Sequence, residues 1–554
     1  MKNTTTFKRS LCILGIAGCS MFFSAVSAQP YLVKDINTGA QGSDPMNATD
    51  FLNKFMFFDA DDGNHGVELW KTDGTAANTV MVKDITAGAN GSDIGSIKEA
   101  GGIVFFSASD GVNGRELWKT DGTGAGTVMI KDIYTGSASS SPDRFIDFGN
   151  ILLFRADDGT TGPELWKSDG TAAGTEMVKD IRPGSQNSDV RSFSNANGKI
   201  FFTADDGTHG VELWTTDGTT AGTVMVTDLN PGSANAFSGS NNFVFAYNGS
   251  YYFWADNGVT GNELWKTDGT AAGTTLVKDI VPGLVGSNSA LPFIVEYNGL
   301  MYFAANNITA GYELWKSDGT DAGTVMVKDI NPGMGNGFIG GLPAVVNNKL
   351  YFAADDGANG TEIWETDGTT TVLFKETIPG NGSGIVFPFF VSPPGSNKFY
   401  FPANTPANGN EIWVSDGTVG GTGLAADVNP GAGSGLVGVN ITYGIGTSYF
   451  FIGNDGVTGD EVWALDPVTN SVKRITANRG DVKLYPNPAS NQLTIELNSH
   501  DNATADIYTT MGQLIQTLPI QGKATVQTGN FACGSYMIII KSDEGVSMYK
   551  FVKE

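Results

Sequence analysis

The stretch GVELWKTDGT, residues 66–75, recurs as GRELWKTDGT at 114–123 and as GPELWKSDGT at 162–171. The motif tryptophan sets the period, because successive copies lie 48 to 51 residues apart. A period of this length is typical of a propeller blade and not of a helical hairpin, so the motif is a building block. Its nine tryptophans are Trp70, Trp118, Trp166, Trp214, Trp265, Trp315, Trp364, Trp413 and Trp463.

One unit is predicted to hold four short strands. In residues 192–233 a variable apolar stretch precedes the runs KIFFTA, VELWTTD and TVMVTDL, which are separated by Gly-, Asp- and Pro-rich turns. This pattern is typical of an antiparallel sheet. Since a four-stranded sheet cannot bury both faces alone, neighbouring units must stack on it. The predicted fold is all-β: a propeller of about nine four-stranded blades, followed by a small Ig-like β-sandwich. Eight blades or an open array are the alternatives.

The repeated segment VKDI indicates how such a ring could close. The sequence contains ten copies of this segment but nine tryptophan strands. A surplus strand at one end suits a ring whose first and last segments pair. The copies begin at Val33, Val82, Ile130, Val178, Val226, Val277 and Val327, with weaker versions at Phe374, Ala425 and Val472.

The motif ELWKTDGTAAGT, residues 263–274, resembles the ELWxxDGT repeat family of secreted bacterial proteins. The resemblance covers nearly all of residues 31–476 and weakens in the last units, EIWETDGT at Glu362, EIWVSDGT at Glu411 and EVWALDPV at Glu461, where Pro467 replaces the turn glycine. It implies architecture and export, and it carries no shared biochemical activity.

The N-terminus has the pattern of an export signal. A basic start precedes the apolar run LCILGIAGCSMFFSAVSA, residues 11–28, and small residues predict cleavage between Ala28 and Gln29. A lipoprotein signal with Cys19 lipidated is the alternative. After cleavage only Cys533 remains, so the exported chain has no disulfide.

After residue 476 the repeat stops and a different composition begins. The YPNP segment, the turn at Gly512 and the GSY near the end resemble the type A C-terminal sorting domain of the type IX secretion system. The resemblance implies the secretion machinery as a partner, transport across both membranes, and attachment to the cell surface or release. The YPNP residues are Tyr485, Pro486, Asn487 and Pro488. The predicted domains are a signal peptide at 1–28, the propeller at 29–476, a linker at 477–481 and the sorting domain at 482–554.

The charge balance excludes some partners. The chain has 58 acidic and 33 basic residues and a net charge of −25, which becomes −28 once the three basic residues of the signal peptide are removed. This balance argues against nucleic acid or an anionic membrane surface as a partner. No apolar segment after the signal peptide is long enough to span a bilayer.

The motif glutamate occurs in all nine units, from Glu68 to Glu461. A catalytic site needs one asymmetric constellation, so a residue repeated in every unit is predicted to be structural, paired with a backbone amide or with a lysine such as Lys83. HExxH, GxSxG and P-loop patterns are absent from the sequence. We therefore assign no catalytic residue.

The paired aspartates of the DDG loops are candidate calcium ligands, because Ca²⁺ prefers hard oxygen donors. Asp-Gly also has the geometry that a tight turn needs, and the turn interpretation is the favoured one. The candidates are Asp61, Asp62, Asp157, Asp158, Asp205, Asp206, Asp355 and Asp356.

A specific site must lie where the units differ. Five arginines concentrate in the second to fourth units, where they could form a basic patch for an anionic glycan or another carboxylate ligand. Scattered, solvated arginines are the simpler interpretation. The five are Arg115, Arg144, Arg155, Arg182 and Arg191.

Three functions fit these observations. The first is a non-enzymatic surface or released propeller that binds glycan, protein or matrix material and serves in adhesion. The second is a propeller-based polysaccharide hydrolase or lyase, and the third is a structural element of a surface layer. Near-uniform repeats favour the first and the third.

Overall fold

The computed structural model describes residues 30–238, 244–287, 293–392, 396–445, 448–465, 482–497, 502–509, 514–532, 534–542 and 545–554. The predicted signal peptide, the VKDI-like copy at Val472 and the predicted linker lie outside these residues. Within them the chain is built of strands, with one short 3₁₀ turn, η1 (Ala76–Asn78). The all-β prediction is confirmed. Among the described residues, no helix has the length and apolar character needed to cross a membrane.

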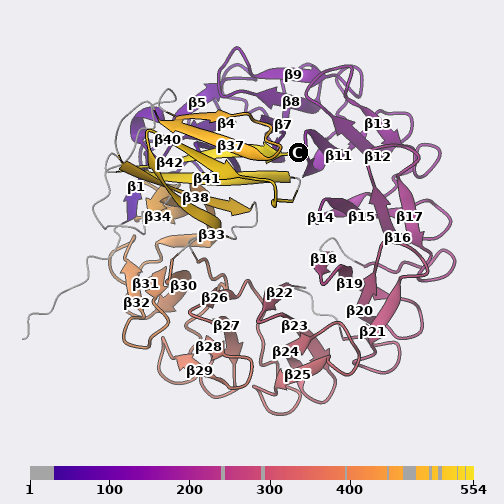
Figure 1. Ribbon diagram of the computed structural model, residues 1–554, viewed down its shortest axis with the longest axis vertical. Coiled ribbons are helices and arrows are strands. Elements are labelled where there is room, and N and C mark those ends of the chain that lie inside the picture. Colours follow the sequence, from indigo (N-terminus) through magenta and orange to yellow (C-terminus); the bar gives the residue numbers. More distant parts are fainter. Residues whose placement is uncertain are drawn as a thin grey trace, which may run out of the picture.

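Nine small antiparallel sheets surround the middle of a ring (Figure 1), and the same four positions recur in the sheets. The innermost strands are β2 (Met46–Phe51), β6 (Ile97–Ala100), β10 (Asp143–Phe148), β14 (Arg191–Ala196), β18 (Phe245–Tyr247), β22 (Ile294–Tyr297), β26 (Ala344–Val346) and β33 (Leu436–Ile445). The second strands are β3 (Phe55–Asp61), β7 (Ile103–Ser109), β11 (Ile151–Asp157), β15 (Lys199–Asp205), β19 (Ser250–Asp256), β23 (Leu300–Asn307), β27 (Lys349–Asp355), β30 (Phe399–Thr405) and β34 (Ser448–Asn454).

The third position is always the tryptophan strand, and the fourth, outermost position is the VKDI region. The third strands are β4 (Val67–Thr72), β8 (Arg115–Thr120), β12 (Pro163–Ser168), β16 (Val211–Thr216), β20 (Asn262–Thr267), β24 (Gly311–Ser317), β28 (Thr361–Thr366), β31 (Gly409–Ser415) and β35 (Asp460–Leu465). The outermost strands are β5 (Val80–Lys83), β9 (Val128–Lys131), β13 (Glu176–Lys179), β17 (Val224–Thr227), β21 (Thr275–Lys278), β25 (Val325–Lys328), β29 (Thr371–Lys375), β32 (Gly423–Ala426) and β1 (Pro30–Leu32).

The first strand of the chain closes the ring. β1 pairs antiparallel with β35, with Leu32 opposite Trp463, and the amide of Val33 donates to the carbonyl of Val462 over 3.0 Å. The VKDI copy at Val33 therefore completes the ninth blade. The prediction of a closed propeller of nine blades is confirmed for the described residues, and the alternatives of eight blades or an open array are wrong.

The eighth blade departs from the predicted four strands. Its sheet holds β30, β31 and β32 only, and an isolated bridge between Val391 and Tyr400 takes the innermost position. Two hydrogen bonds of 2.9 and 2.8 Å form this bridge. Pro388, three residues before the bridge, has no amide hydrogen to extend the pairing.

The core lies between the blades. Adjacent motif residues point to opposite faces of a strand. Leu69 therefore contacts the second blade, whereas Trp70 contacts the ninth. In the interface of the first two blades, Leu69 and Phe57 pack against Phe106 and Trp118. The other interfaces repeat this arrangement, so each blade buries its faces against both neighbours.

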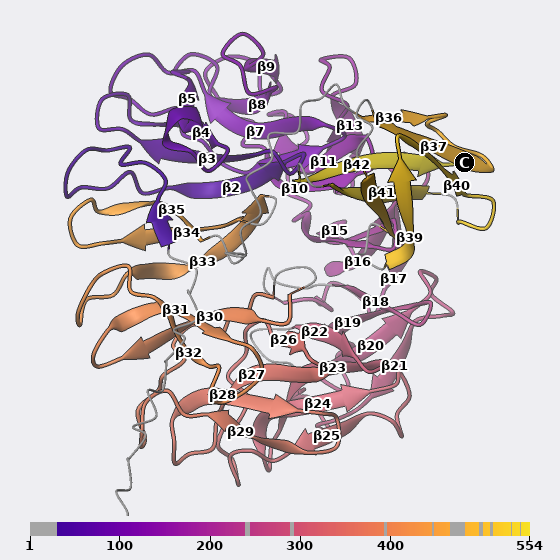
Figure 2. The ribbon, with the colours of Figure 1, turned by 60° about the vertical axis from the view of Figure 1, so that its left-hand side comes forward.

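The C-terminal domain, yellow in Figure 2, has a core of its own. Its strands form two groups, β36–β37–β40 and β39–β38–β41–β42, joined at the β39–β40 hairpin. Leu493 of the first group packs with Ile507 and Ile538 of the second, which is a small sandwich. Its strands are β36 (Val482–Tyr485), β37 (Gln492–Leu497), β38 (Asn502–Thr509), β39 (Leu514–Gln521), β40 (Lys523–Gln527), β41 (Gly534–Ser542) and β42 (Gly545–Lys553).

Candidate functional site

The motif glutamates are fully buried and hold the loop that leads to the next blade. Glu212 accepts hydrogen bonds from the amides of Leu229 and Asn230 over 3.0 and 3.2 Å. The other eight glutamates accept amides of the corresponding loops. The predicted pairing with backbone amides is therefore confirmed. The predicted partner Lys83 is wrong, because its Nζ donates to the carbonyl of Thr127 over 2.9 Å.

Burial raises the pKa of these carboxyl groups. The pKa of Glu212 rises to about 8, and that of Glu68, Glu164, Glu263, Glu313 and Glu411 to about 7. A shifted carboxyl group often marks an active site. Here the same shift recurs around the ring, so it reflects the common burial of a structural group.

In five of the nine repeats two lysines link neighbouring blades, a role that the sequence reasoning missed. Lys71 Nζ donates to the carbonyl of Gly122 in the next DGT turn over 2.6 Å. Lys83 Nζ lies 5.7 Å from the centre of the Trp118 ring of the next blade. The recurrence of both lysines at the same positions in these repeats is the signal that could have revealed this role.

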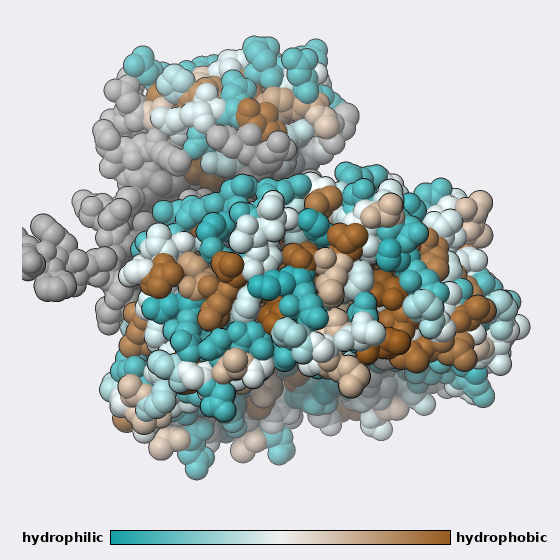
Figure 3. All heavy atoms as spheres, turned by 90° about the horizontal axis from the view of Figure 1, so that it is seen from below, coloured by the Kyte–Doolittle hydropathy of each residue, from teal (hydrophilic) through white to brown (hydrophobic). Residues whose placement is uncertain are grey.

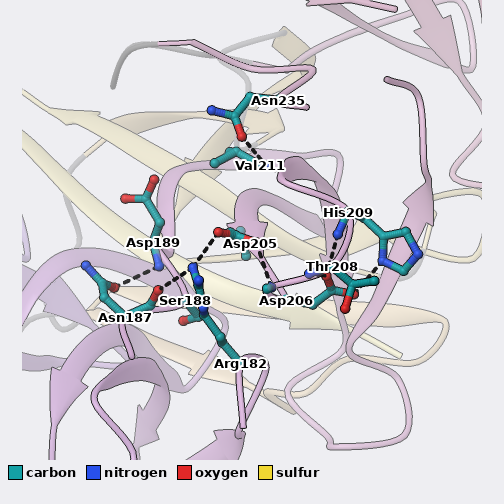
Figure 4. A network of polar contacts seen from close by, with 12 residues as sticks. Arg182, Asn187, Ser188, Asp189, Asp205, Asp206, Thr208, His209, Val211 and Asn235 are labelled. Atoms are coloured by element: carbon teal, nitrogen blue, oxygen red, sulfur yellow. Dashed lines mark hydrogen bonds and ion pairs between the residues drawn. The ribbon is translucent and has the colours of Figure 1, made fainter. Parts of the chain in front are cut away.

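The aspartates of the DDG loops are engaged within their own turns. Asp206 Oδ1 accepts the amides of Thr208 and His209 over 2.8 and 2.9 Å, and Oδ2 lies 2.7 Å from His209 Nδ1 (Figure 4). Asn257 makes the same two amide contacts in the fifth blade, although it has no charge. The equivalent contacts occur at Asp62, Asp158 and Asp356.

The first aspartate of each pair also caps its turn. Asp61, Asp157, Asp205 and Asp355 each accept the amide of the loop glycine over 2.7 Å. Among the described residues, no group of three or more His, Cys, Asp or Glu side chains has an arrangement that could hold a metal ion. Calcium binding by these loops stays a prediction.

Two of the five predicted arginines belong to separate ion pairs. Arg182 Nη1 lies 2.5 Å from Asp205 Oδ2 and joins two adjacent loops (Figure 4). Arg115 makes a two-point contact with Asp93, in which Nε donates to Oδ2 over 2.8 Å. Neither arginine lies in the cluster formed by the other three.

The ring is not uniform where the chain enters its innermost strands. In the first four blades this entry residue is polar and left-handed, with a φ of 46° to 56°. A buried apolar residue or proline follows it and fills the interface. In the fifth, seventh, eighth and ninth blades the entry residue is itself buried and apolar. The polar entries are Asp44, Asp93, Ser141 and Asp189, and the apolar ones are Phe237, Phe338, Ile385 and Leu436.

A second position follows the same division. The residue of the second strand that pairs with the motif leucine, or with its Ile or Val equivalent, is polar in the first four blades and apolar in the other five. The polar residues are Asp59, Ser107, Arg155 and Thr203. The apolar residues are Trp254, Ala304, Ala353, Pro402 and Ile452. We call the four polar entry residues and the four polar second-strand residues the polar arc.

Three arginines gather within this arc. Arg155 shares the face of β11 that carries Leu153 toward the fourth blade, and Arg191 begins β14 of that blade. Arg155 makes two hydrogen bonds of 2.8 and 2.6 Å with Asp143, its direct cross-strand partner. Arg191 pairs with Asp189. Arg144 is 41% exposed, and its contact with Asp143 spans 3.9 Å.

The charges of this arginine cluster act on one another. Burial lowers the pKa of Arg191, and the positive charges of Arg144 and Arg155 lower it further. The backbone of the cluster is strained at Arg144, which has a φ of 58°. This left-handed conformation is unfavourable for residues other than glycine. Strained backbone of this kind is often found at functional sites, where it fixes the orientation of a side chain.

Buried polar atoms without a partner among the described residues occur around the whole ring, as at the Nε1 of most motif tryptophans. Two of them belong to arc residues, Asp59 Oδ1 and Ser107 Oγ, and a third, Arg191 Nε, belongs to the arginine cluster. Burial raises the pKa of Asp59, which is only 5% exposed. An unsatisfied buried polar atom costs stability, so its retention calls for an explanation such as an absent ligand or water.

A small cavity adjoins one end of the polar arc, at the seam between the ninth and first blades. Its volume is about 300 Å³. Phe58, Phe450 and Val462 give it apolar walls, and Asn47 contributes the polar side. Asn47 donates to Asp59 Oδ2 over 3.0 Å, so a hydrogen bond links the lining of the cavity to the arc.

Residues 483–554 match the family model of the secretion system C-terminal sorting domain. The C-terminal domain is a sorting domain. The prediction of a type IX sorting domain is thereby confirmed, and this domain places the chain at the cell surface or outside the cell. The YPNP residues lie at its start, with Tyr485 at the end of β36.

Among curated proteins nothing matches the chain. Solved structures to which the chain is similar include prolyl oligopeptidase B from Galerina marginata, with 10% identity, 84% of this chain and 56% of that chain covered, and a TM-score of 0.36. A prolyl endopeptidase has 11% identity, coverages of 69% and 55%, and a TM-score of 0.33. TolB from Acinetobacter baumannii has 12% identity, coverages of 59% and 77%, and a TM-score of 0.26. The chain spans about half the length of the two peptidases.

Proposed function

We propose that this protein is a non-enzymatic binding propeller that is displayed on the cell surface or released, and that it takes part in adhesion to glycan, protein or matrix material. The observation that carries the proposal is the polar arc. Its eight residues are polar at two positions of the repeat where the later described blades have apolar residues. All eight lie in the first four blades. The resemblance to the ELWxxDGT repeat family agrees with an exported propeller of this kind.

The chemistry of the arc favours binding over catalysis. Asp143 and Asp189 are engaged in ion pairs with Arg155 and Arg191, so their carboxylate groups are occupied within the protein. Asp59 has the raised pKa of an acid, but its burial keeps it from a substrate. An arginine-rich surface without a placed acid is suited to holding an anionic or hydroxylated ligand.

A steric block can test the proposal. Ser141, an exposed residue of the arc, is changed to Cys in a Cys533→Ser background and labelled with a bulky maleimide. Val345, 42% exposed on the innermost strand of the seventh blade, provides the matched control. Binding of the mature protein to a panel of glycans and matrix proteins is then measured by surface plasmon resonance.

We expect the label at Ser141→Cys to abolish binding and the label at Val345→Cys to leave it unchanged. Equal binding by both labelled proteins would contradict the proposal. Assays for new reducing ends or unsaturated sugars in the same panel would reveal a hydrolase or a lyase. A protein that binds nothing in the panel and assembles into ordered arrays would support the structural surface-layer alternative.

A further inference from the structure

We propose that the arginine cluster of Arg144, Arg155 and Arg191 binds the carboxylate of an acidic sugar in a polysaccharide, with Arg144 as the residue that contacts it. The inference rests on the proposed binding function and names its ligand class. It follows from which guanidinium groups already have a carboxylate partner, from the net charge of the cluster and from the buried N–H donor of Arg191 that has no partner among the described residues.

Two of the three guanidinium groups already hold a carboxylate. Asp143 accepts from Nε and Nη2 of Arg155, and Asp189 pairs with Nη2 of Arg191. The Arg155–Asp143 pair shows that the cluster accommodates a planar carboxylate in the two-point geometry that arginine favours. Arg144 lies beside them on β10 with only the long contact to Asp143, so its guanidinium group is available to a further carboxylate.

The charge balance sets the number of negative charges that the cluster can accept. Three arginines and two aspartates leave one positive charge uncompensated. A single carboxylate would neutralise it, and this is the charge of one uronic acid residue. The whole chain has a net charge of −25, so a ligand of high charge density, such as a heavily sulfated glycan, meets general repulsion.

The unpaired donor belongs to Arg191 of the same cluster. Arg191 Nε is buried without a partner among the described residues, and its side chain as a whole is 23% exposed. The positive charges of Arg144 and Arg155 add to the cost of keeping this group charged. A bound anion would offset that repulsion and satisfy the donor.

The ligand class can be tested with the mature protein and probes of defined chemistry. The carboxylated probes are polygalacturonate, alginate and hyaluronan. Methyl-esterified polygalacturonate, a neutral galactan, a sulfated galactan and poly-glutamate are the comparison set. The variants are Arg144→Ala, Arg144→Lys and, as a control of equal charge change outside the cluster, Arg182→Ala, whose partner Asp205 is not an arc residue. Calorimetry gives the affinities, and melting temperatures verify that each variant is folded.

We expect at least one carboxylated polysaccharide to bind in a salt-sensitive manner and the neutral galactan not to bind. For polygalacturonate, methyl esterification should remove any binding. Arg144→Ala should weaken the binding roughly tenfold or more, because a charged hydrogen-bonded contact is lost. Arg144→Lys should restore it only in part, since lysine lacks the planar fork. Arg182→Ala should bind as the unmodified protein does.

Several results would overturn the inference. These are equal binding of an esterified and a free polysaccharide, tighter binding of the sulfated galactan, a preference for poly-glutamate, and unchanged affinity of the Arg144→Ala variant. If a neutral ligand bound and the label at Ser141→Cys blocked it, the carboxylate inference would fail while the proposed function stood. If that label blocked nothing, the proposed function would fail.

Discussion

At the residue scale, the motif tryptophan fills the interface between two blades, and side chains of the preceding blade pack against it. Trp214 is 5% exposed and packs against Leu165 and Val178 of the preceding blade. Lys179 of that blade lies 5.6 Å from the centre of its ring. One side chain thus combines apolar burial with a cation–π contact across an interface.

Replacing this side chain tests how much it contributes to the stability of the propeller. Trp214→Ala should lower the free energy of unfolding by about 3–5 kcal/mol, because it opens a cavity between two blades. The control is Val224→Ala on β17 of the same blade, where the side chain is 44% exposed and the expected change is within about 0.5 kcal/mol. Urea unfolding followed by tryptophan fluorescence measures both. A fully stable Trp214→Ala protein would show that the tryptophan does not hold the interface.

At the element scale, the Asp-Gly loops and the closing strand β1 carry distinct predictions. The loops are hydrogen-bonded within themselves, since Asp206 and the uncharged Asn257 accept equivalent amides. Strand β1 joins the two ends of the propeller through β35. The loops therefore do not need a metal for their shape, whereas the ring does need its first strand.

Calorimetric melting tests the loops. We expect the melting temperature of the mature protein to be the same in EDTA and in millimolar calcium, because the loop carboxylates already have amide partners. Magnesium at equal ionic strength is the control for screening. A rise of several degrees that calcium alone produces would make the paired aspartates metal ligands.

Deleting residues 29–36 tests the closure. The deletion removes β1 together with the buried side chains of Val33 and Ile36, which are 2% and 6% exposed in the interface of the first and ninth blades. We expect a lower melting temperature and faster proteolysis in those two blades. Deletion of residues 482–554 is the control, because the core of that domain contains no propeller residue. Equal stability of the two deletions would refute a role for β1 in holding the ring.

At the scale of the whole molecule, the motif glutamates shift their pKa in the same direction, so the pH dependence of stability reports their combined contribution. Burial raises the pKa of Glu212 to about 8 from its ordinary value of 4.5, and the other motif glutamates shift in the same direction. Stability that comes from a raised pKa is fully present below the unfolded value and is lost as pH rises through the folded value.

The aspartates of the DGT turns act in the opposite direction. The hydroxyl and amide of Thr219 donate to Asp217 and lower its pKa, as the equivalent threonines do in other blades. Their contribution is present above the unfolded value of 3.8 and is lost as pH falls through the folded value. We therefore expect the melting temperature to be highest near about pH 4 to 4.5 and to fall as the pH rises from there toward about 8. A melting temperature that rises steadily from pH 5 to pH 8 would contradict the shift of the glutamates.

The molecular surface offers no single dominant apolar patch on the side that Figure 3 shows, where hydrophobic residues lie in several separate groups among hydrophilic ones. Exposed apolar residues scattered in this way are normal for a soluble surface. The asymmetry of the polar arc is therefore the feature of the whole molecule that best indicates a ligand site.

The sequence by itself determined the blade, the surplus first strand and the sorting domain. These follow from local chemistry: the period of Trp70 and its copies, the alternation along each strand, and the turn residues after it. The sequence also identified the arginines as the residues in which the units differ. It did not distinguish Arg144, Arg155 and Arg191 from Arg115, which has a separate partner.

Only the tertiary structure decided which residues meet. The sequence separates Asp143 from Arg155 by 12 positions and Arg155 from Arg191 by 36. Strand register places Asp143 opposite Arg155, and blade stacking directs Arg155 toward the blade that Arg191 begins. Left-handed entry residues such as Asp189 turn a regular repeat into a polar arc. Contacts of this kind depend on register and stacking, which a periodic sequence specifies equally in every blade, so the position of the arc emerges only once the ring is closed.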